Sequence, residues 1–217
     1  MQLQIALDRV SLRDAVELTK QVRESADWIE VGTSLIKRYG VAAVEQIVAA
    51  AGRTPVLADS KTADDARNEL LMFYAAGATS ATVLGCVELA TIQRALETAA
   101  EQSAEIVIDL LATDDHRKDE ISRMIAGRRH VVMAAHVGKD SQGPKPARRI
   151  RLGSWPVDVQ VAIAGGLSSE DVPWIRSARP DARLIVGSAI TAAADPGAAA
   201  AETHEAVRQP RHGANKQ

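Results

Sequence analysis

The feature that most constrains the fold is a regular alternation of short apolar runs with longer helical segments. Eight runs rich in β-branched residues predict strands, at residues 3–7, 28–31, 55–59, 80–84, 105–110, 130–136, 159–164 and 183–187. Segments with helical spacing lie between most of them, at residues 11–24, 34–51, 63–76, 88–102, 115–127, 168–177 and 189–207. This α/β alternation predicts parallel strands joined by right-handed crossovers. Eight units favour a closed (β/α)8 TIM barrel, with an open doubly wound sheet as the alternative.

The length and apolar content fit a single domain. The chain has 217 residues, of which 46% are hydrophobic, enough to build a core. We expect the domain to span residues 1–203, and residues 204–217, where the apolar periodicity is lost, to be a flexible C-terminal tail. The interval 137–157 breaks the alternation with glycine and proline turn signals, so any helix there must be short and basic. In a barrel this interval is the loop after the sixth strand, on the face that carries active sites.

Composition excludes several classes of partner. The net charge is −2 and the basic residues are scattered, which argues against nucleic-acid binding. The single cysteine, Cys86, rules out an internal disulfide, fits a reducing compartment and follows an apolar run, so we expect it to be buried. No apolar run approaches the ~20 residues of a membrane span, and the opening MQLQIALDRV lacks a basic region leading into a long apolar segment. We therefore expect a cytoplasmic protein without a membrane partner.

Charged residues stand where the predicted strands end, which is where barrel enzymes place their functional groups. They are Asp8, Glu30, Asp59 with Lys61, Asp109 and His136. A charged group near an apolar core is costly unless it is paired, so five strands that end in this way indicate one shared site.

The stretch VLADSKTADD, residues 56–65, places a lysine among carboxylates. Residues two apart on a strand face the same side, so Asp59 and Lys61 are expected to project together while Ser60 faces the helices. Asp64 follows where the loop enters the next helix. A lysine between Asp59 and Asp64 keeps its proton and can act as a fixed cation beside a developing oxyanion. For an isolated Asp-x-Lys pair, the alternative is an ion network that only satisfies a barrel end.

The last two predicted strands run into small residues that suit an anion. These are Gly165, Gly166, Gly187 and Ser188. Glycines let backbone N–H groups approach a ligand closely, and the start of the helix in VGSAIT offers a positive dipole end. Barrels that bind phosphorylated substrates often use these two loops, although a tight structural turn is the alternative. We therefore expect a sugar phosphate as substrate.

Several motifs, in order along the chain, carry a resemblance to a known family. They are IALD, IEVGTSLI, the D-x-K-x-x-D of ADSKTAD, VLG at 83–85, VIDLL, AGG at 164–166, and VGSAIT followed by ADP at 186–196. Together they resemble the orotidine monophosphate decarboxylase suprafamily, and within it the 3-hexulose-6-phosphate synthases and 3-keto-L-gulonate-6-phosphate decarboxylases. The resemblance implies a ribulose-phosphate-binding barrel that dimerises through its active-site face. It also implies that Asp64 reaches into the partner's site.

The resemblance also implies a metal. The orotidine monophosphate decarboxylases have a lysine at the end of the second strand, whereas this chain has Glu30, as expected for the metal-dependent branch. Glu30 and Asp59 are then ligands of Mg²⁺, with Mn²⁺ as a possible substitute, and the metal stabilises a 1,2-enediolate as a Lewis acid. Lys61 is the electrostatic partner of the enediolate, and Asp8 orients Lys61 or a substrate hydroxyl. His136 is a proton shuttle, which an ordinary pKa near ~6.5 suits, or else a hydrogen-bonded residue at a strand end.

Two residues bear on the substrate. Asp109 in IVIDLL matches the synthases, whereas the decarboxylases usually have glutamate there. Lys139, in the loop after the sixth strand, matches neither branch and is a candidate substrate contact. The leading hypothesis is an aldolase-type lyase that joins ribulose 5-phosphate and formaldehyde. The alternatives are decarboxylation of a 3-keto sugar-acid phosphate and a catalytically silent barrel that binds a sugar phosphate.

Overall fold

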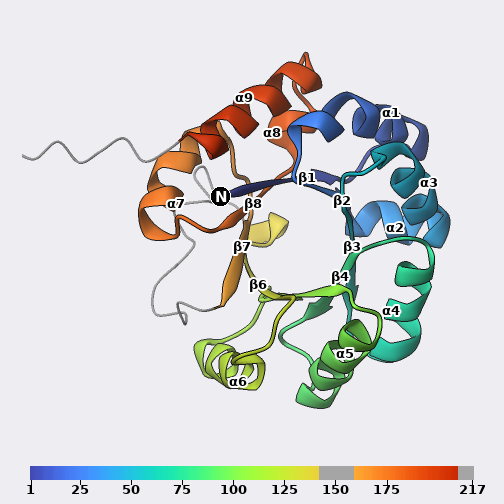
Figure 1. The fold of residues 1–217 in the computed structure, drawn as a ribbon, viewed down its shortest axis with the longest axis vertical. Helices are drawn as coiled ribbons and strands as arrows, with labels where there is room; N and C mark the ends of the chain where they lie inside the picture. Colours follow the sequence, from blue (N-terminus) through green and yellow to red (C-terminus); the bar gives the residue numbers. More distant parts are fainter. Residues whose placement is uncertain (142–158, 210–217) are drawn as a thin grey trace, which may run out of the picture.

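The computed structural model describes residues 1–141 and 159–209, which form a closed barrel of parallel strands surrounded by helices (Figure 1). The strands are β1 Gln2–Leu7, β2 Trp28–Val31, β3 Val56–Thr62, β4 Ser80–Leu84, β5 Glu105–Asp109, β6 Val131–His136, β7 Gln160–Ala164 and β8 Arg183–Val186. Each strand pairs with the next in sequence, and β8 pairs with β1. The predicted (β/α)8 barrel is confirmed, and the open-sheet alternative is wrong.

Helices follow the strands and cover the outside of the barrel (Figure 1). They are α1 Leu12–Val22, α2 Thr33–Tyr39, α3 Val41–Ala51, α4 Ala66–Ala75, α5 Leu89–Glu101, α6 Asp115–Ile125, α7 Val172–Ala178, α8 Ser188–Thr191 and α9 Pro196–Arg208, with short 3₁₀ turns η1 Arg23–Ser25, η2 Lys139–Ser141 and η4 Ser169–Asp171. Two predicted helices are each divided in the structure. Gly40, at φ 65°, separates α2 from α3, and Pro196 begins α9 after the short α8.

The apolar residues form two layers because side chains alternate along each strand. The larger layer lies between the strands and the helices and includes Leu3, Ile5 and Leu7 of β1. The smaller layer fills the inside of the barrel and consists of Leu57, Val107, Val132, Ala134 and Ala162, with Trp28 and Ile185 against it. Asp59 and Asp109 each follow a residue of this inner layer by two positions. They therefore share its inward face at the carboxyl ends of the strands.

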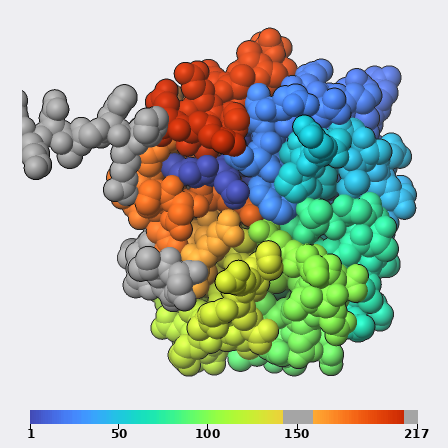
Figure 2. All heavy atoms as spheres, in the orientation of Figure 1, coloured from blue at the N-terminus to red at the C-terminus, as the bar shows by residue number. Residues whose placement is uncertain are grey.

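The two ends of the described chain meet beside β1. Figure 2 shows the red spheres of α9 against the blue spheres of the N-terminal segments, and α9 packs on both α1 and β1. Val207 is buried, and Nη2 of Arg208 lies 2.6 Å from Oδ1 of Asp27. The expected domain end at residue 203 is therefore wrong, because α9 continues through Arg208. The rest of the expected flexible tail, residues 210–217, lies outside the described residues.

The structure also bears on the expectations for Cys86, for the interval 137–157 and for membrane-spanning segments. Cys86 is exposed, because it follows the end of β4 in the loop that leads to α5, so its expected burial is wrong. The short basic helix expected within 137–157 falls mainly in residues 142–158, outside the described part of the chain. Within residues 1–141 and 159–209, no helix combines the length and hydropathy needed to cross a membrane.

Candidate active site

A cavity of about 350 Å³ opens at the carboxyl ends of the strands and collects most of the predicted site residues. Those that line it are Asp8, Glu30, Asp59, Lys61, Asp109, His136, Lys139, Gly165, Gly166, Gly187 and Ser188. They come from the first strand to the last. The rule that barrel sites form at the carboxyl ends of strands therefore placed them correctly.

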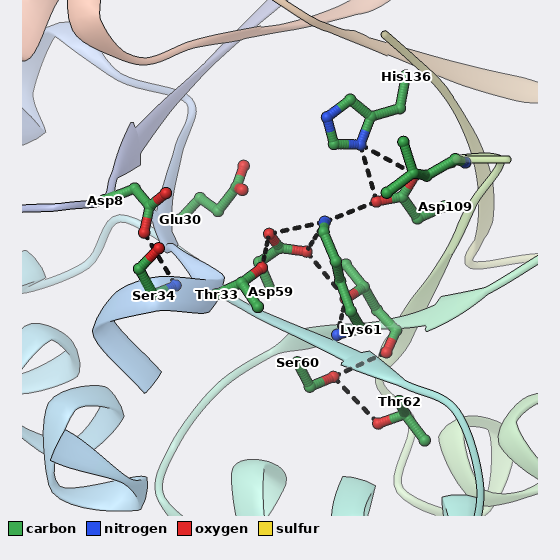
Figure 3. Close-up of polar contacts among 12 residues, drawn as sticks. Asp8, Glu30, Thr33, Ser34, Asp59, Ser60, Lys61, Thr62, Asp109 and His136 are labelled. Atoms are coloured by element: carbon green, nitrogen blue, oxygen red, sulfur yellow. Dashed lines mark hydrogen bonds and ion pairs between the residues drawn. The ribbon is translucent and has the colours of Figure 1, made fainter. Parts of the chain in front are cut away.

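Lys61 lies at the centre of this group (Figure 3). Its Nζ is 2.9 Å from both carboxylate oxygens of Asp59 and 2.7 Å from Oδ2 of Asp109. The expectation that a lysine is held between two carboxylates is confirmed, but the second carboxylate is Asp109 and not Asp64. Asp64 is exposed in the loop between β3 and α4, where Oδ1 accepts a hydrogen bond from the backbone N–H of Asp65. Its role in a partner's site stays a prediction.

An irregularity in β3 sets the direction of the Lys61 side chain. The pairing with β4 shifts register between Ala58 and Thr62, and Lys61 has a φ of 47°. Oγ1 of Thr82 accepts a hydrogen bond from the Lys61 backbone N–H at 2.7 Å, and Oγ of Ser60 donates to the Thr82 carbonyl at 2.7 Å. Asp59 and Lys61 therefore meet as expected, although not on a regular strand. Ser60 fastens β3 to β4, a structural role.

The charges of the cluster reinforce one another. Burial raises the pKa of Asp109, but its hydrogen bond to His136 and the charge of Lys61 outweigh burial and lower this pKa to about 2. Burial lowers the pKa of His136, yet the hydrogen bond to Asp109, from Nδ1 at 3.0 and 3.1 Å, outweighs burial and raises it. Burial likewise lowers the pKa of Lys61, while Asp59 and Asp109 raise it above its usual value. The cluster therefore favours a charged lysine beside an ionised Asp109, which also holds the His136 ring.

The pKa of the Glu30 carboxyl shifts upward, in the direction opposite to that of Asp109. Its side chain is buried beside Asp59, and burial, followed by the charge of Asp59, raises the pKa of Glu30 to about 8. Nε2 of Gln4 donates a hydrogen bond to Oε2 of Glu30 at 2.5 Å. Two carboxylates that face one pocket repel each other, so a cation between them would favour the ionised form of both.

Asp8 lies on the far side of the pocket from Lys61 (Figure 3). Its Oδ1 accepts a hydrogen bond from the backbone N–H of Ser34 at 2.9 Å, at the start of α2. Gly32 leaves room for this contact, because a Cβ there would lie 2.6 Å from Cβ of Asp8. Among the described residues, the side-chain partners of Lys61 are Asp59 and Asp109. Direct orientation of Lys61 by Asp8 is therefore wrong, and a contact with a substrate hydroxyl stays a prediction.

The loops after β7 and β8 bring backbone close to the cavity. Gly165 has a φ of 124°, and a Cβ there would lie 2.8 Å from the carbonyl oxygen of Val137, so glycine is required. The helix after Gly187 is the four-residue α8, whose Ile190 and Thr191 N–H groups donate to the Gly187 carbonyl. The N–H groups of Ser188 and Ala189 precede this first hydrogen-bonded turn. The phosphate prediction therefore rests on backbone N–H groups, since so short a helix adds little dipole.

Comparison with known proteins identifies the family. Residues 1–203 match the family model described as orotidine 5'-phosphate decarboxylase / HUMPS family. The chain belongs to this family.

Similar members of the family share nearly the full length of the chain. One, named 3-hexulose-6-phosphate synthase, from Bacillus subtilis (strain 168), is 34% identical over 214 residues, covering 96% of this chain and 100% of the relative. The crystal structure of 3-hexulose-6-phosphate synthase from Salmonella typhimurium has a TM-score of 0.84 and 34% identity, covering 95% of this chain and 98% of that one. The crystal structure of 3-keto-L-gulonate-6-phosphate decarboxylase from Vibrio cholerae has a TM-score of 0.78 and 25% identity, covering 95% and 96%.

In this member of the orotidine 5'-phosphate decarboxylase / HUMPS family, Glu30 and Asp59 are the residues that could hold a magnesium ion, and the metal itself stays a prediction. The described residues contain no group of three or more His, Cys, Asp and Glu side chains arranged to hold a metal. Mg²⁺ does not require one, because it keeps several waters and takes oxygens from its substrate. A divalent cation would also relieve the repulsion that contributes to the raised pKa of Glu30. Both residues offer the hard oxygen donors that Mg²⁺ and Mn²⁺ prefer.

Three polar residues of the site were missed by the sequence analysis. Thr33 and Thr82 donate hydrogen bonds to Oδ2 and Oδ1 of Asp59 at 2.6 and 3.1 Å, and Gln4 donates to Glu30. The predicted site consists mainly of charged strand ends, and the fourth strand ends without a charge. Strand alternation could have indicated Gln4. It precedes Asp8 by four positions, and residues an even number of positions apart on a strand face the same side.

Proposed function

We propose that this protein is an aldehyde-lyase of the 3-hexulose-6-phosphate synthase type, which joins ribulose 5-phosphate and formaldehyde through a 1,2-enediolate. The observation that carries the proposal is the Lys61 ammonium, held by Asp59 and Asp109 inside a cavity that also contains Glu30 and His136. The relatives named 3-hexulose-6-phosphate synthase, at 34% identity over nearly the whole chain, support the same reaction.

Glu30 and Asp59 are the residues that would hold a magnesium ion. When bound, the ion would supply Lewis acidity to the carbonyl of the sugar. The arrangement of Asp59 favours a fixed position, because Thr33, Thr82 and Lys61 all donate hydrogen bonds to it. Burial and the charge of Asp59 raise the pKa of Glu30 to about 8, so Glu30 would have to lose a proton to hold the ion.

The other residues of the site divide into anchoring and reacting groups. The backbone around Gly165, Gly166, Gly187 and Ser188 would bind the phosphate, and Asp8 would accept a hydrogen bond from a sugar hydroxyl. Lys61 would then stabilise the negative charge that develops on the enediolate oxygen, and a partly buried, fixed cation does this without reorganisation.

The proton balance of the reaction assigns a role to His136. In its neutral form it would accept the C1 proton of ribulose 5-phosphate, leaving the enediolate. C1 then attacks the carbonyl carbon of formaldehyde, and one carbon–carbon bond forms. The former aldehyde oxygen takes a proton from His136, which completes a hexulose 6-phosphate and restores the neutral ring. Asp109 would hold the imidazole in place through Nδ1.

One observation favours a second candidate. Lys139 lines the cavity from the loop that follows His136, where a cation can contact a substrate carboxylate. That contact would suit decarboxylation of a 3-keto sugar-acid phosphate through a similar enediolate. The two reactions share the phosphate anchor and Lys61, and they differ in the electrophile that captures the enediolate.

A homodimer with shared sites is part of the proposal. Asp64 is exposed near the mouth of the barrel and is not needed by the cluster around Lys61. It is therefore available to a second copy of the chain, as the family resemblance implies.

The test is exchange of solvent deuterium into C1 of ribulose 5-phosphate, followed by NMR, with Mg²⁺, with EDTA and without formaldehyde. Magnesium-dependent exchange at C1 is the expected result, since enediolate formation does not need the aldehyde. Addition of formaldehyde should then convert the pentulose to a hexulose phosphate. Absence of exchange under all conditions would contradict the proposal. Exchange without consumption of formaldehyde would favour the decarboxylase.

A further inference from the structure

The end of the barrel opposite the cavity contains a buried ion pair that crosses the interior. Arg183, the first residue of β8, is 1% exposed, and its Nη1 and Nη2 lie 2.8 and 2.7 Å from Oε1 and Oε2 of Glu105, the first residue of β5. The guanidinium also lies 4.2 Å from the ring centroid of Trp28. We call this end, formed by Arg183, Glu105, Trp28, Gln2 and Gln4, the floor of the barrel.

One residue of the floor also touches the candidate active site. Oε1 of Gln4 accepts a hydrogen bond from Nη1 of Arg183 at 3.3 Å, while Nε2 of the same amide donates to Glu30 at 2.5 Å. Gln4 is 1% exposed, so these two partners decide how its amide is oriented. A guanidinium has donors only, and it therefore selects the oxygen of the amide. The nitrogen is left facing Glu30.

We propose that Arg183 is a positioning residue for the reaction: through the Gln4 amide, it fixes the carboxylate of Glu30 with Oε2 bonded to Gln4 and Oε1 left for the ligand in the cavity. The role rests on the proposed function, in which Glu30 contributes to the metal site. Loss of a residue that orients a ligating group commonly lowers metal affinity or activity by about 10- to 100-fold. Arg183 would act in this way from the opposite end of the barrel.

The test needs a variant that removes the cation without leaving a buried charge alone. Arg183→Met by itself leaves Glu105 unpaired, which is strongly destabilising. The double variant Arg183→Met with Glu105→Gln avoids this problem. The matched control is Gln2→Met, because Oε1 of Gln2 accepts from Nε of Arg183 at 3.3 Å on the same floor without a hydrogen bond to Glu30.

The first readout does not need a metal or a substrate. The side-chain NH₂ group of Gln4 should give NMR signals that exchange slowly with solvent and are well separated in the wild-type protein. We expect rapid exchange and loss of this separation in the double variant, and unchanged signals in Gln2→Met. Unchanged Gln4 signals in the folded double variant would overturn the proposal, whatever the activity of the enzyme.

The second readout connects the floor to the chemistry. Titration with Mn²⁺ should show a dissociation constant about 10- to 100-fold higher in the double variant than in the wild-type protein and Gln2→Met. The rate of deuterium exchange should fall by a similar factor at saturating substrate, with little change in KM. If the wild-type protein neither binds Mn²⁺ nor exchanges C1, the proposed function fails, and the Gln4 signals still decide whether Arg183 fixes the amide. If Mn²⁺ affinity is equal in all three proteins, the positioning role toward the metal site is wrong.

Discussion

Lys61 and Asp109 form an ion pair of 2.7 Å between β3 and β5, two strands separated by β4 in the barrel. The pair joins the D-x-K-x-x-D segment to the fifth strand and, through Asp109, to His136. A charge introduced near Lys61 during the reaction therefore acts on His136 as well, whose pKa Asp109 raises. This relationship leads to the first two predictions.

Asp109→Asn should lower the pKa of His136, because the hydrogen bond and charge of Asp109 hold that pKa above its usual value. The measurement is a pH titration of the histidine ring protons by NMR, without substrate. The ring-proton signals of His116, which is well exposed on α6, serve as the internal reference. A His136 curve that stayed in place would show that Asp109 does not set its protonation.

Lys61→Ala should reduce kcat by about 10²- to 10³-fold, with a much smaller change in KM, because the ammonium stabilises charge that develops during the reaction. Steady-state kinetics and the C1 exchange rate would measure this loss. Circular dichroism should confirm that the barrel is intact, since removal of the cation leaves Asp59 and Asp109 near each other. A rise in KM alone would contradict the assigned role.

Glu30→Gln should stabilise the metal-free protein above about pH 8. Burial and the charge of Asp59 raise the pKa of Glu30 from 4.5 to about 8, so the folded protein binds one more proton than the unfolded chain between these values. Stability therefore falls as the pH rises through this window. Glutamine has no proton to lose, and a gain of up to about 5 kcal/mol, at about 1.4 kcal/mol per pKa unit, would raise Tm by up to roughly 10–20 °C.

Calorimetry at about pH 6 and about pH 9 would measure this effect for both proteins in EDTA. The variant should show the smaller change between the two pH values, and it should no longer bind Mn²⁺. Equal pH dependence in the two proteins would show that Glu30 is ionised in the folded metal-free state.

A mixture of Lys61→Ala and Asp64→Ala should recover activity if each site uses Asp64 from the partner. Both variants should be nearly inactive alone. Hybrid dimers then contain one intact site and one site with both changes, so random exchange of subunits restores about a quarter of the wild-type activity. Mixing after brief unfolding and refolding, with activity followed over time, tests this. No recovery from a mixture that forms hybrid dimers would place Asp64 in its own subunit's site or outside both.

The fold was predictable because the signal repeats. Each β-branched run and each helical segment is local, and eight repetitions leave few arrangements that bury all the apolar faces. The errors lie where the chain departs from that rhythm, as at Gly40, which divides one predicted helix, and in α9, which continues past residue 203.

The site was predictable to the level of strand ends and no further. Spacing along the chain indicates that Asp59 and Lys61 are close, but the approach of Asp109 depends on how β3 and β5 face each other across the barrel interior. The choice of Asp64 as the second carboxylate followed sequence proximity and was wrong for this reason. Gln4 is uncharged, so strand alternation was the signal that could have placed it in the site, and its role comes from contacts with Glu30 and Arg183.

The pairing of β8 with β1 also has a consequence for the newly made chain. Strands emerge from the ribosome in order, so β1 has a free edge until β8 appears. Arg183 arrives on that same last strand, and until then Glu105 and Gln4 have no cation between them. Strand β8 therefore completes the backbone pairing of the barrel with β1, and the same strand places Arg183 beside Glu105. A nascent chain that stops before β8 should leave the edge of β1 open and Glu105 without its cation, and it should be a substrate for chaperones and not a smaller barrel.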